Sequence, residues 1–333
     1  MGPISDLQLQ EGDDESWIPG KLYLLGDSGV AEKEFEIGLN VRGNFRRMSD
    51  ACNFPPFWLN LKKADVKGTV FANQDKLKVV VHCQKRKASY EKYVFKEYLV
   101  YKTYNLITDA SFRVRLAKIE YVETSGWLKP KPTTHPAFLI EHHSSVAERL
   151  GGKEFEGQAA LPTLFADEAL IRAELFEFLI GNTDFSLFAG VDECCHNAKV
   201  IQIKAGPGAF VPVPYDFDLS GIVNAPYAVT NPSLELDSVT ERLFRGTACP
   251  PAVLDATIRH FLSKRDAILK LWGTTELLEE KERREAVAYL EEFFAIISNP
   301  AAVQKQIKSR MPSKERMDEF LKKKYPDAFT EKR

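Results

Sequence analysis

Cysteine is scarce in this chain. Five cysteines occur in 333 residues, at irregular spacing and without a Cys-x-x-Cys pair. So few and so irregularly spaced cysteines argue against a disulfide framework. Cys194 and Cys195 directly precede His196. Because adjacent cysteines rarely bind one ion together, we expect no zinc site there.

Long apolar runs and an excess of one charge are also missing. No run approaches the ~20 apolar residues that a membrane helix needs. The 45 Lys and Arg residues nearly balance the 47 Asp and Glu residues, for a formal net charge of −2. This balance gives no reason to expect nucleic acid or an anionic membrane as a partner. The N-terminus is polar and lacks a hydrophobic signal region, so we expect a cytoplasmic protein, or a secreted or periplasmic one if a leader has been removed.

The first half of the chain is predicted to form strands with one helix. Alternating or nearly continuous apolar residues indicate each strand. The predicted strands are Leu22–Leu25, Glu34–Val41, Phe57–Leu61, Leu77–His82, Phe112–Val122 and Ala137–Ile140. A helix from about Ser89 to Leu106 follows the Leu77–His82 strand, which is predicted to be central. We expect a small antiparallel sheet with one helix packed on it.

One charged residue lies on the apolar stripe of that helix. Val94, Glu97, Tyr101 and Tyr104 share a face by their spacing. Spacing alone favours a glutamate at the margin of the stripe that reaches solvent. The alternative is that Glu97 is held inward and pairs with Lys78 on the central strand.

The second half is predicted to be mainly helical. Asp167 is expected to cap a helix that stops at Gly181. Three more amphipathic helices are predicted at Pro250–Trp272, Glu276–Ile297 and Ala301–Leu321, with a frayed charged tail from Lys322. We therefore predict an α+β chain with an N-terminal extension (1–34), a β-rich lobe (35–145), a mainly helical lobe (146–325) and a tail (326–333).

A hairpin in the second half gathers acidic residues. The Gly-Pro-Gly turn at residues 206–208 predicts a strand pair whose open end brings its flanking segments together. Asp184 and Asn197 precede the first strand, and Asp216 and Asp218 follow the second. Carboxylate and amide oxygens that converge in this way suit a hard cation such as Mg²⁺.

The order of these parts resembles the CotH (spore coat protein H) family of atypical kinases over about residues 35–225. The matching pieces are Arg42-Gly43-Asn44, the Leu77–His82 strand with its helix, Phe138–Glu141, Gly181–Asp184 with His196-Asn197, and Pro214–Asp218. The resemblance implies a two-lobed protein-kinase-like fold and an ATP- and Mg²⁺-dependent phosphotransferase. The acceptor would carry a hydroxyl group and could be a protein.

The resemblance also implies a role for each site residue. Asp184 would be the catalytic aspartate, and Lys78 and Glu97 an ion pair beside the phosphates. Arg42, Gly43 and Asn44 would form a turn over the nucleotide phosphates, and Glu141 would lie at the nucleotide site. Asn197 and Asp216 would bind the metal, and Asp218 is a further candidate ligand.

Two departures from the family pattern leave alternatives open. Asp184 and Asn197 are thirteen positions apart, whereas Asp192 lies five before Asn197, the usual kinase spacing. We prefer Asp184 because it directly follows a helix end. Phe45 and Arg46 replace the small hydroxyl residues expected after Arg-Gly-Asn, which weakens the case for phosphate contacts there. A pseudokinase or nucleotide-binding interaction module without transfer activity is the main alternative function, and a metal-dependent hydrolase that shares only the acidic constellation is another.

Overall fold

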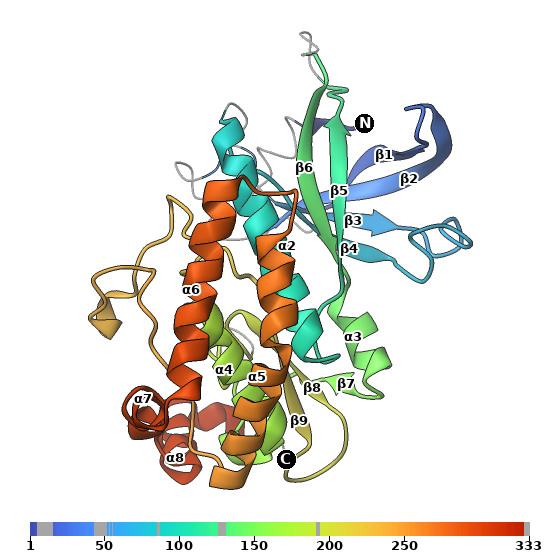
Figure 1. Ribbon diagram of the computed structural model, residues 1–333. Coiled ribbons are helices and arrows are strands. Elements are labelled where there is room, and N and C mark those ends of the chain that lie inside the picture. Colours follow the sequence, from blue (N-terminus) through green and yellow to red (C-terminus); the bar gives the residue numbers. More distant parts are fainter. Residues whose placement is uncertain are drawn as a thin grey trace. The chain divides into compact units, whose positions relative to one another are not determined.

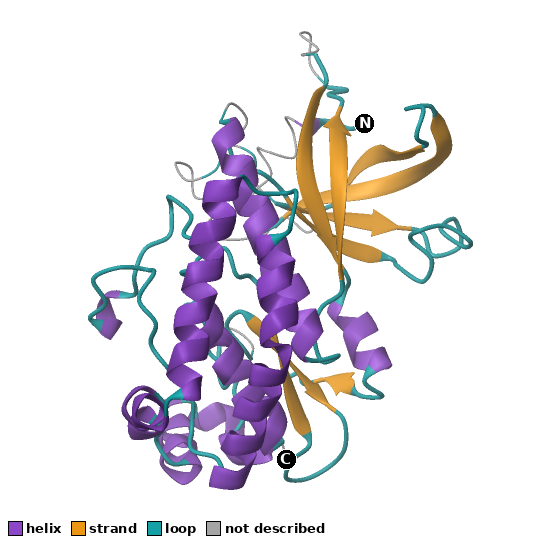
Figure 2. Cartoon of the chain, in the orientation of Figure 1, coloured by secondary structure: helices purple, strands orange, loops and turns teal. Residues whose placement is uncertain are grey.

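The computed structural model describes residues 1–4, 16–42, 52, 54, 56–84, 87–125, 131–190 and 194–329. The chain divides into two compact units. Met1–Tyr98 and Arg113–Ser145 form the first, and Leu99–Phe112 and Val146–Arg333 form the second. The fold is α+β, as predicted. Strands gather in the first unit, whereas the second is helical apart from one small sheet (Figure 2).

The first unit is built on one twisted antiparallel sheet of six strands (Figure 1). Its strands are β1 (Ile18–Leu25), β2 (Ala31–Val41), β3 (Phe57–Leu61), β4 (Lys76–Val80), β5 (Val114–Tyr121) and β6 (Thr133–Ile140). They lie in the order β1-β2-β3-β4-β6-β5. All six predicted strands are present, and β4 is internal between β3 and β6, as the apolar run at Leu77–His82 predicted.

The predicted N-terminal extension is partly wrong, because β1 and the start of β2 lie within residues 1–34. Leu22 of β1 pairs with Phe35 of β2. Ile18, Leu22 and Leu24 alternate along β1 and pack against the core of the sheet. Because polar and glycine residues lie between them, the sequence predicted the strand only from Leu22 onward and missed its first residues.

Alternation decides which face of the sheet is buried. Apolar residues at every second position of β2 (Phe35, Ile37, Leu39 and Val41) join those of β3 and β4 in one core. The N-terminal half of helix α2 (Glu91–Ile107) contributes Tyr98, whose ring lies 6.0 Å from that of Phe138 on β6. Helix α2 agrees closely with its prediction and continues into the second unit.

Helix α4 (Asp167–Ile180) is the buried helix of the second unit. Ten of its residues are buried, which fits a helix that is apolar on most sides. It ends at Gly181 in the left-handed conformation (φ 65°), as predicted. The predicted cap is wrong: Ala166 occupies the cap position, and Asp167 begins the helix with its carboxylate paired to Lys314.

Two long helices pack side by side in the second unit, α5 (Pro251–Gly273) and α6 (Glu280–Ser298) (Figure 1). The single helix predicted at Ala301–Leu321 is instead α7 (Pro300–Gln306), a short 3₁₀ turn (Lys308–Arg310) and α8 (Lys314–Lys324). Pro312 cannot donate a backbone hydrogen bond, and the Ser313 hydroxyl accepts one from the Arg316 N–H, so a new helix begins here.

The C-terminal segment is more ordered than predicted. Helix α8 (Lys314–Lys324) extends past Lys322, and a 3₁₀ helix follows at Pro326–Phe329. Tyr325 and Phe329 pack against the core of the second unit. Apolar side chains among the lysines therefore hold the segment that charge alone predicted to fray.

Among the helices that the structure describes, none alone is long and apolar enough to cross a bilayer. By length and composition, Glu280–Ser298 and Pro300–Lys324 together would suffice, but they are bent by 100°.

Four of the five cysteines are paired, contrary to the expectation from their spacing. Cys52 is bonded to Cys83 and Cys194 to Cys195. The backbone of Phe54 pairs with that of Cys83 in an isolated β-bridge, which brings Cys52 within reach of Cys83. Spacing along the chain could not reveal this proximity.

Candidate functional site

The predicted hairpin is present in the second unit. Strands β8 (Ala198–Gln202) and β9 (Phe210–Pro214) pair antiparallel, with Ala198 opposite Pro214. Beyond this pair, the Tyr215 N–H donates to the Asn197 carbonyl over 2.9 Å. Asn197 and Asp216 therefore lie on neighbouring segments at the open end of the hairpin. A short third strand, β7 (Lys153–Glu154), was not predicted.

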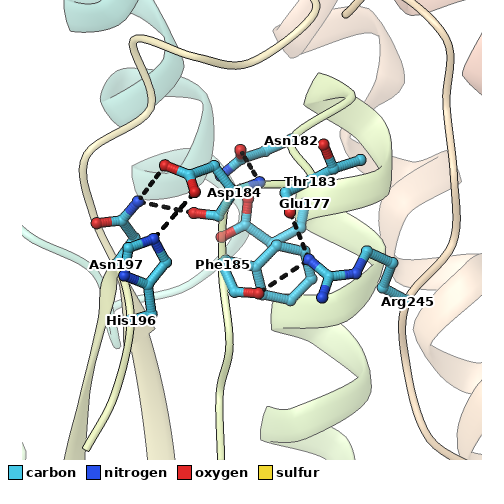
Figure 3. A network of polar contacts seen from close by, with 8 residues as sticks. All are labelled: Glu177, Asn182, Thr183, Asp184, Phe185, His196, Asn197 and Arg245. Carbon is cyan, nitrogen blue, oxygen red and sulfur yellow. Dashed lines mark hydrogen bonds and ion pairs between the residues drawn. The ribbon is translucent and has the colours of Figure 1, made fainter. Parts of the chain in front are cut away.

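Asp184 and Asn197 are in direct contact despite their separation in sequence. The Asn197 Nδ2 donates to the Asp184 carbonyl over 2.7 Å and to its Oδ2 over 3.0 Å (Figure 3). The intervening segment returns to its start, because the Ser186 N–H donates to the His196 carbonyl over 3.0 Å. Two hydrogen bonds from one amide fix both the backbone and the carboxylate of Asp184.

His196 completes this contact and was missed as a site residue. Its Nε2 lies 2.9 Å from Asp184 Oδ1 (Figure 3). The hydrogen bond to Asp184 is the largest cause of a raised His196 pKa, which Asp216 also raises, whereas burial and Arg245 oppose the shift. Adjacency to Asn197 was the sequence signal that could have identified it.

The Asp216-Phe217-Asp218 motif is anchored by aromatic residues. Phe217 is fully buried, and its ring lies 4.7 Å from that of Tyr101 and 5.5 Å from that of Phe176. The Tyr101 hydroxyl accepts a hydrogen bond from the Asp216 N–H over 2.9 Å. Asp216 itself is left-handed, with φ 65°. These contacts hold the backbone between the two aspartates in one conformation.

The two aspartates of the motif offer oxygens close together. One carboxylate oxygen of Asp216 lies within 4.8 Å of one of Asp218. Because Asn197 Nδ2 is directed at Asp184, Oδ1 is the Asn197 atom suited to a cation. Two carboxylates and an amide oxygen form a donor set that fits Mg²⁺ or Ca²⁺ rather than a soft metal.

Two of the predicted site residues are buried charges in the first unit. Lys78 lies on β4 opposite Trp58, with 6% of its surface exposed, and its Nζ is 5.4 Å from the centroid of the Trp58 ring. Glu97 on α2 is 2% exposed. The favoured interpretation, a Glu97 that reaches solvent, is therefore wrong. That Glu97 pairs with Lys78 stays a prediction.

The remaining predicted residues are placed only in part. Arg42 follows β2, with its guanidinium carbon 5.8 Å from the centroid of the Trp58 ring. Gly43 and Asn44, and the rival aspartate Asp192, lie outside the described residues. The Glu141 carboxylate accepts a hydrogen bond from the Arg113 N–H over 2.7 Å, so it fastens the start of β5 to the end of β6.

Two buried glutamates on α4 were not singled out from the sequence. Burial raises the pKa of Glu174 and of Glu177 to about 8. Glu174 Oε1 accepts hydrogen bonds from the Thr247 N–H over 3.0 Å and the Thr247 hydroxyl over 3.2 Å. Apolar residues flank each glutamate, so the helix was interpreted as hydrophobic and its charges were not considered. A glutamate between apolar residues on a buried helix was the signal that could have identified them.

The pH dependence of stability should change in Glu174→Gln. Between the ordinary glutamate pKa of 4.5 and about 8, the folded protein keeps a proton at Glu174 that the unfolded chain releases. The free energy of unfolding should therefore fall as pH rises through this window, by up to about 1.4 kcal/mol per pH unit. Glutamine keeps an acceptor oxygen and cannot ionise, so the variant should lose this component. Urea unfolding at pH 5.5, 7 and 8.5 measures it.

Glu168→Gln is the matched control, because Glu168 is exposed on the same helix. It should follow the wild-type pH profile. Equal pH dependence in the wild type and Glu174→Gln would show that Glu174 does not hold a proton in the folded state.

Comparison of the sequence with protein-family models and with curated proteins found no match.

Proposed function

We propose that this chain is an ATP- and Mg²⁺-dependent phosphotransferase that transfers phosphate to a hydroxyl acceptor. One observation carries the proposal. Asp184 is held by Asn197 at the open end of a hairpin from which Asp216 and Asp218 also project. This combines a fixed, partly exposed carboxylate with an oxygen donor set, and phosphoryl transfer needs both.

The metal would be held by Asp216, Asp218 and Asn197 Oδ1. When bound, Mg²⁺ neutralises phosphate charge and orients the transferred group. The protein contributes a fixed donor set, since Tyr101 and Phe176 hold the motif from behind. Asn197 links this donor set to Asp184, because its Nδ2 donates to Asp184 while its Oδ1 would bind the metal.

Asp184 would orient the acceptor hydroxyl and accept its proton. Its side chain is 42% exposed, so an acceptor can reach it, and hydrogen bonds to Asn197 and His196 restrict its rotation. Holding the reacting oxygen in line contributes more here than covalent chemistry, because phosphoryl transfer asks little of the protein beyond positioning and charge.

Lys78 would neutralise phosphates that do not react, and Glu97 would hold Lys78. Support comes from their burial in one unit, since buried charges are stable only when paired. Arg42, which follows β2 and lies beside the same Trp58 ring, would add positive charge. The family resemblance described above suggests the same roles.

Thermal stability with ATP and Mg²⁺, alone and together, tests the proposal. Together, at 100 times the dissociation constant, they should raise the free energy of unfolding by about 2.7 kcal/mol. Asp216→Asn should remove the Mg²⁺-dependent part, since asparagine tolerates the left-handed backbone at this position. Asp255→Asn, an exposed position on α5, is the matched control and should respond like the wild type.

The outcomes separate the candidate functions. No stabilisation by ATP, Mg²⁺ or both would refute the phosphotransferase. Stabilisation without transfer of labelled γ-phosphate to protein and small-molecule hydroxyls would instead identify a nucleotide-binding module.

A further inference from the structure

The loop that carries Asp184 is supported from the protein interior by a buried amide. Asn182 is 1% exposed, and its Oδ1 accepts a hydrogen bond from the Asp184 N–H over 3.0 Å (Figure 3). Its Nδ2 donates to Glu177 Oε2 over 2.9 Å. Glu177 is fully buried on the last turn of α4. A chain of two hydrogen bonds therefore runs from this helix to the Asp184 backbone.

A partly buried arginine holds the same loop from another side. The Arg245 Nη1 donates to the Thr183 carbonyl and, over 3.0 Å, to the Phe185 carbonyl (Figure 3). These are the carbonyls on either side of Asp184. The guanidinium also lies over the Phe185 ring, with its carbon 5.2 Å from the ring centroid. One side chain thus fixes the peptide groups that flank the aspartate.

The side chains behind this loop are polar, although apolar side chains would fill the same space. The Asp184 side chain is 42% exposed, yet the groups behind it are an amide and a carboxyl in the interior and a partly buried guanidinium. Burying such groups is unfavourable unless they are hydrogen-bonded. Here every hydrogen bond described above ends on Asn182 or on the main chain of residues 183–185. Their shared consequence is a fixed direction for Asp184.

We propose that Glu177, Asn182 and Arg245 are positioning residues that brace Asp184 for its part in the reaction. The inference rests on the proposed function of Asp184, but the brace itself is defined by contacts within one unit. In this brace, Glu177 accepts a hydrogen bond from Asn182. The second oxygen, Oε1, has no partner among the described residues, and the raised pKa agrees with a neutral carboxyl. Glutamine should therefore replace it, whereas alanine should not.

Kinetics of labelled phosphate transfer, with separate measurement of Mg²⁺–ATP binding, tests the brace. Asn182→Ala and Arg245→Lys should lower kcat about 10- to 100-fold, because a misplacement near 1 Å is enough for such a loss. Lysine keeps the charge but not the fork that reaches two carbonyls. Binding of Mg²⁺–ATP should be unchanged. Glu177→Ala should lower kcat, and Glu177→Gln should restore it.

Arg242→Lys is the matched control. The Arg242 side chain is also buried and donates to main-chain carbonyls, at Leu179 and Tyr289, but none of the hydrogen bonds described for it ends on residues 183–185. This variant should keep kcat per folded molecule. An equal loss of kcat in Arg242→Lys and Arg245→Lys would reduce the brace to general stability and overturn the proposal.

Hydrogen exchange gives a second readout that does not depend on activity. A peptide covering residues 181–187 should exchange faster in Asn182→Ala and Arg245→Lys than in the wild type and Arg242→Lys. Unchanged exchange there overturns the brace. If the wild type neither binds Mg²⁺–ATP nor transfers phosphate, the phosphotransferase fails, and exchange alone then decides whether the loop is braced. Transfer by the wild type with unchanged kcat in the variants overturns the brace only.

Discussion

Asp184→Asn should lower the rate of phosphate transfer by about 10²- to 10⁴-fold, the range expected when a general base is removed. Asparagine has the same shape, so the loop should stay folded. Its amide can still accept from Asn197 Nδ2 through one oxygen, and His196 can change tautomer to meet the new N–H group. The loss should therefore appear in kcat, with Mg²⁺–ATP binding retained. Single-turnover transfer and a thermal melt on the same preparation measure both.

Asp192→Asn decides between the two candidate aspartates. If Asp184 acts in the reaction, Asp192→Asn should transfer phosphate at close to the wild-type rate. The opposite pattern, with activity kept in Asp184→Asn and lost in Asp192→Asn, would assign the role to Asp192. Asp255→Asn again serves as the neutral control.

Gly181→Ala should destabilise the protein by about 3–5 kcal/mol, among the largest effects of a single substitution. Two causes add. A left-handed backbone is about 1–2 kcal/mol less favourable for alanine, and φ is 65° here. In addition, the new Cβ would overlap the Tyr289 hydroxyl oxygen, so the Tyr289 side chain, α6 or the loop must move. The midpoint of urea unfolding measures the effect.

Two further variants separate those causes. Gly151 has φ 66° and open space around its Cβ position, so Gly151→Ala should show only the backbone effect. Tyr289→Phe removes the overlapping oxygen, which has no hydrogen-bond partner among the described residues. Gly181→Ala should therefore be milder in the Tyr289→Phe background than in the wild type. Equal destabilisation by Gly181→Ala in both backgrounds would show that the overlap with Tyr289 does not contribute to the effect.

The strands and most helices could be predicted because their signal is local. Alternation in Glu34–Val41 and Phe57–Leu61 reports directly which face is buried. Glu97 shows the limit of that signal. Helical spacing places it on the apolar stripe, but only tertiary packing decides whether it is buried. The last predicted helix is interrupted at Pro312. Its prediction followed the apolar spacing and overlooked this proline.

The approach of Asn197 to Asp216 was also predictable, but the contacts that support these residues were not. The glycine turn at residues 206–208 was enough to bring Asn197 and Asp216 together. Tyr101 and Arg245 reach the site from segments more than 60 residues away, and nothing in their own sequence surroundings signals a contact. Long-range contacts of this kind depend on how the whole core packs, and no local pattern in the sequence predicts them.

The aromatic support of Asp216 and Asp218 bears on how a cation would be bound. Two carboxylates held within 4.8 Å repel each other, and a flexible loop would relax by moving them apart. With Phe217 buried and the Asp216 N–H fixed by Tyr101, the backbone of the motif resists this relaxation. A cation would then meet ligands already in place, so that little of its binding energy is lost in ordering the loop. Metal binding should accordingly appear as added stability, with little change in shape.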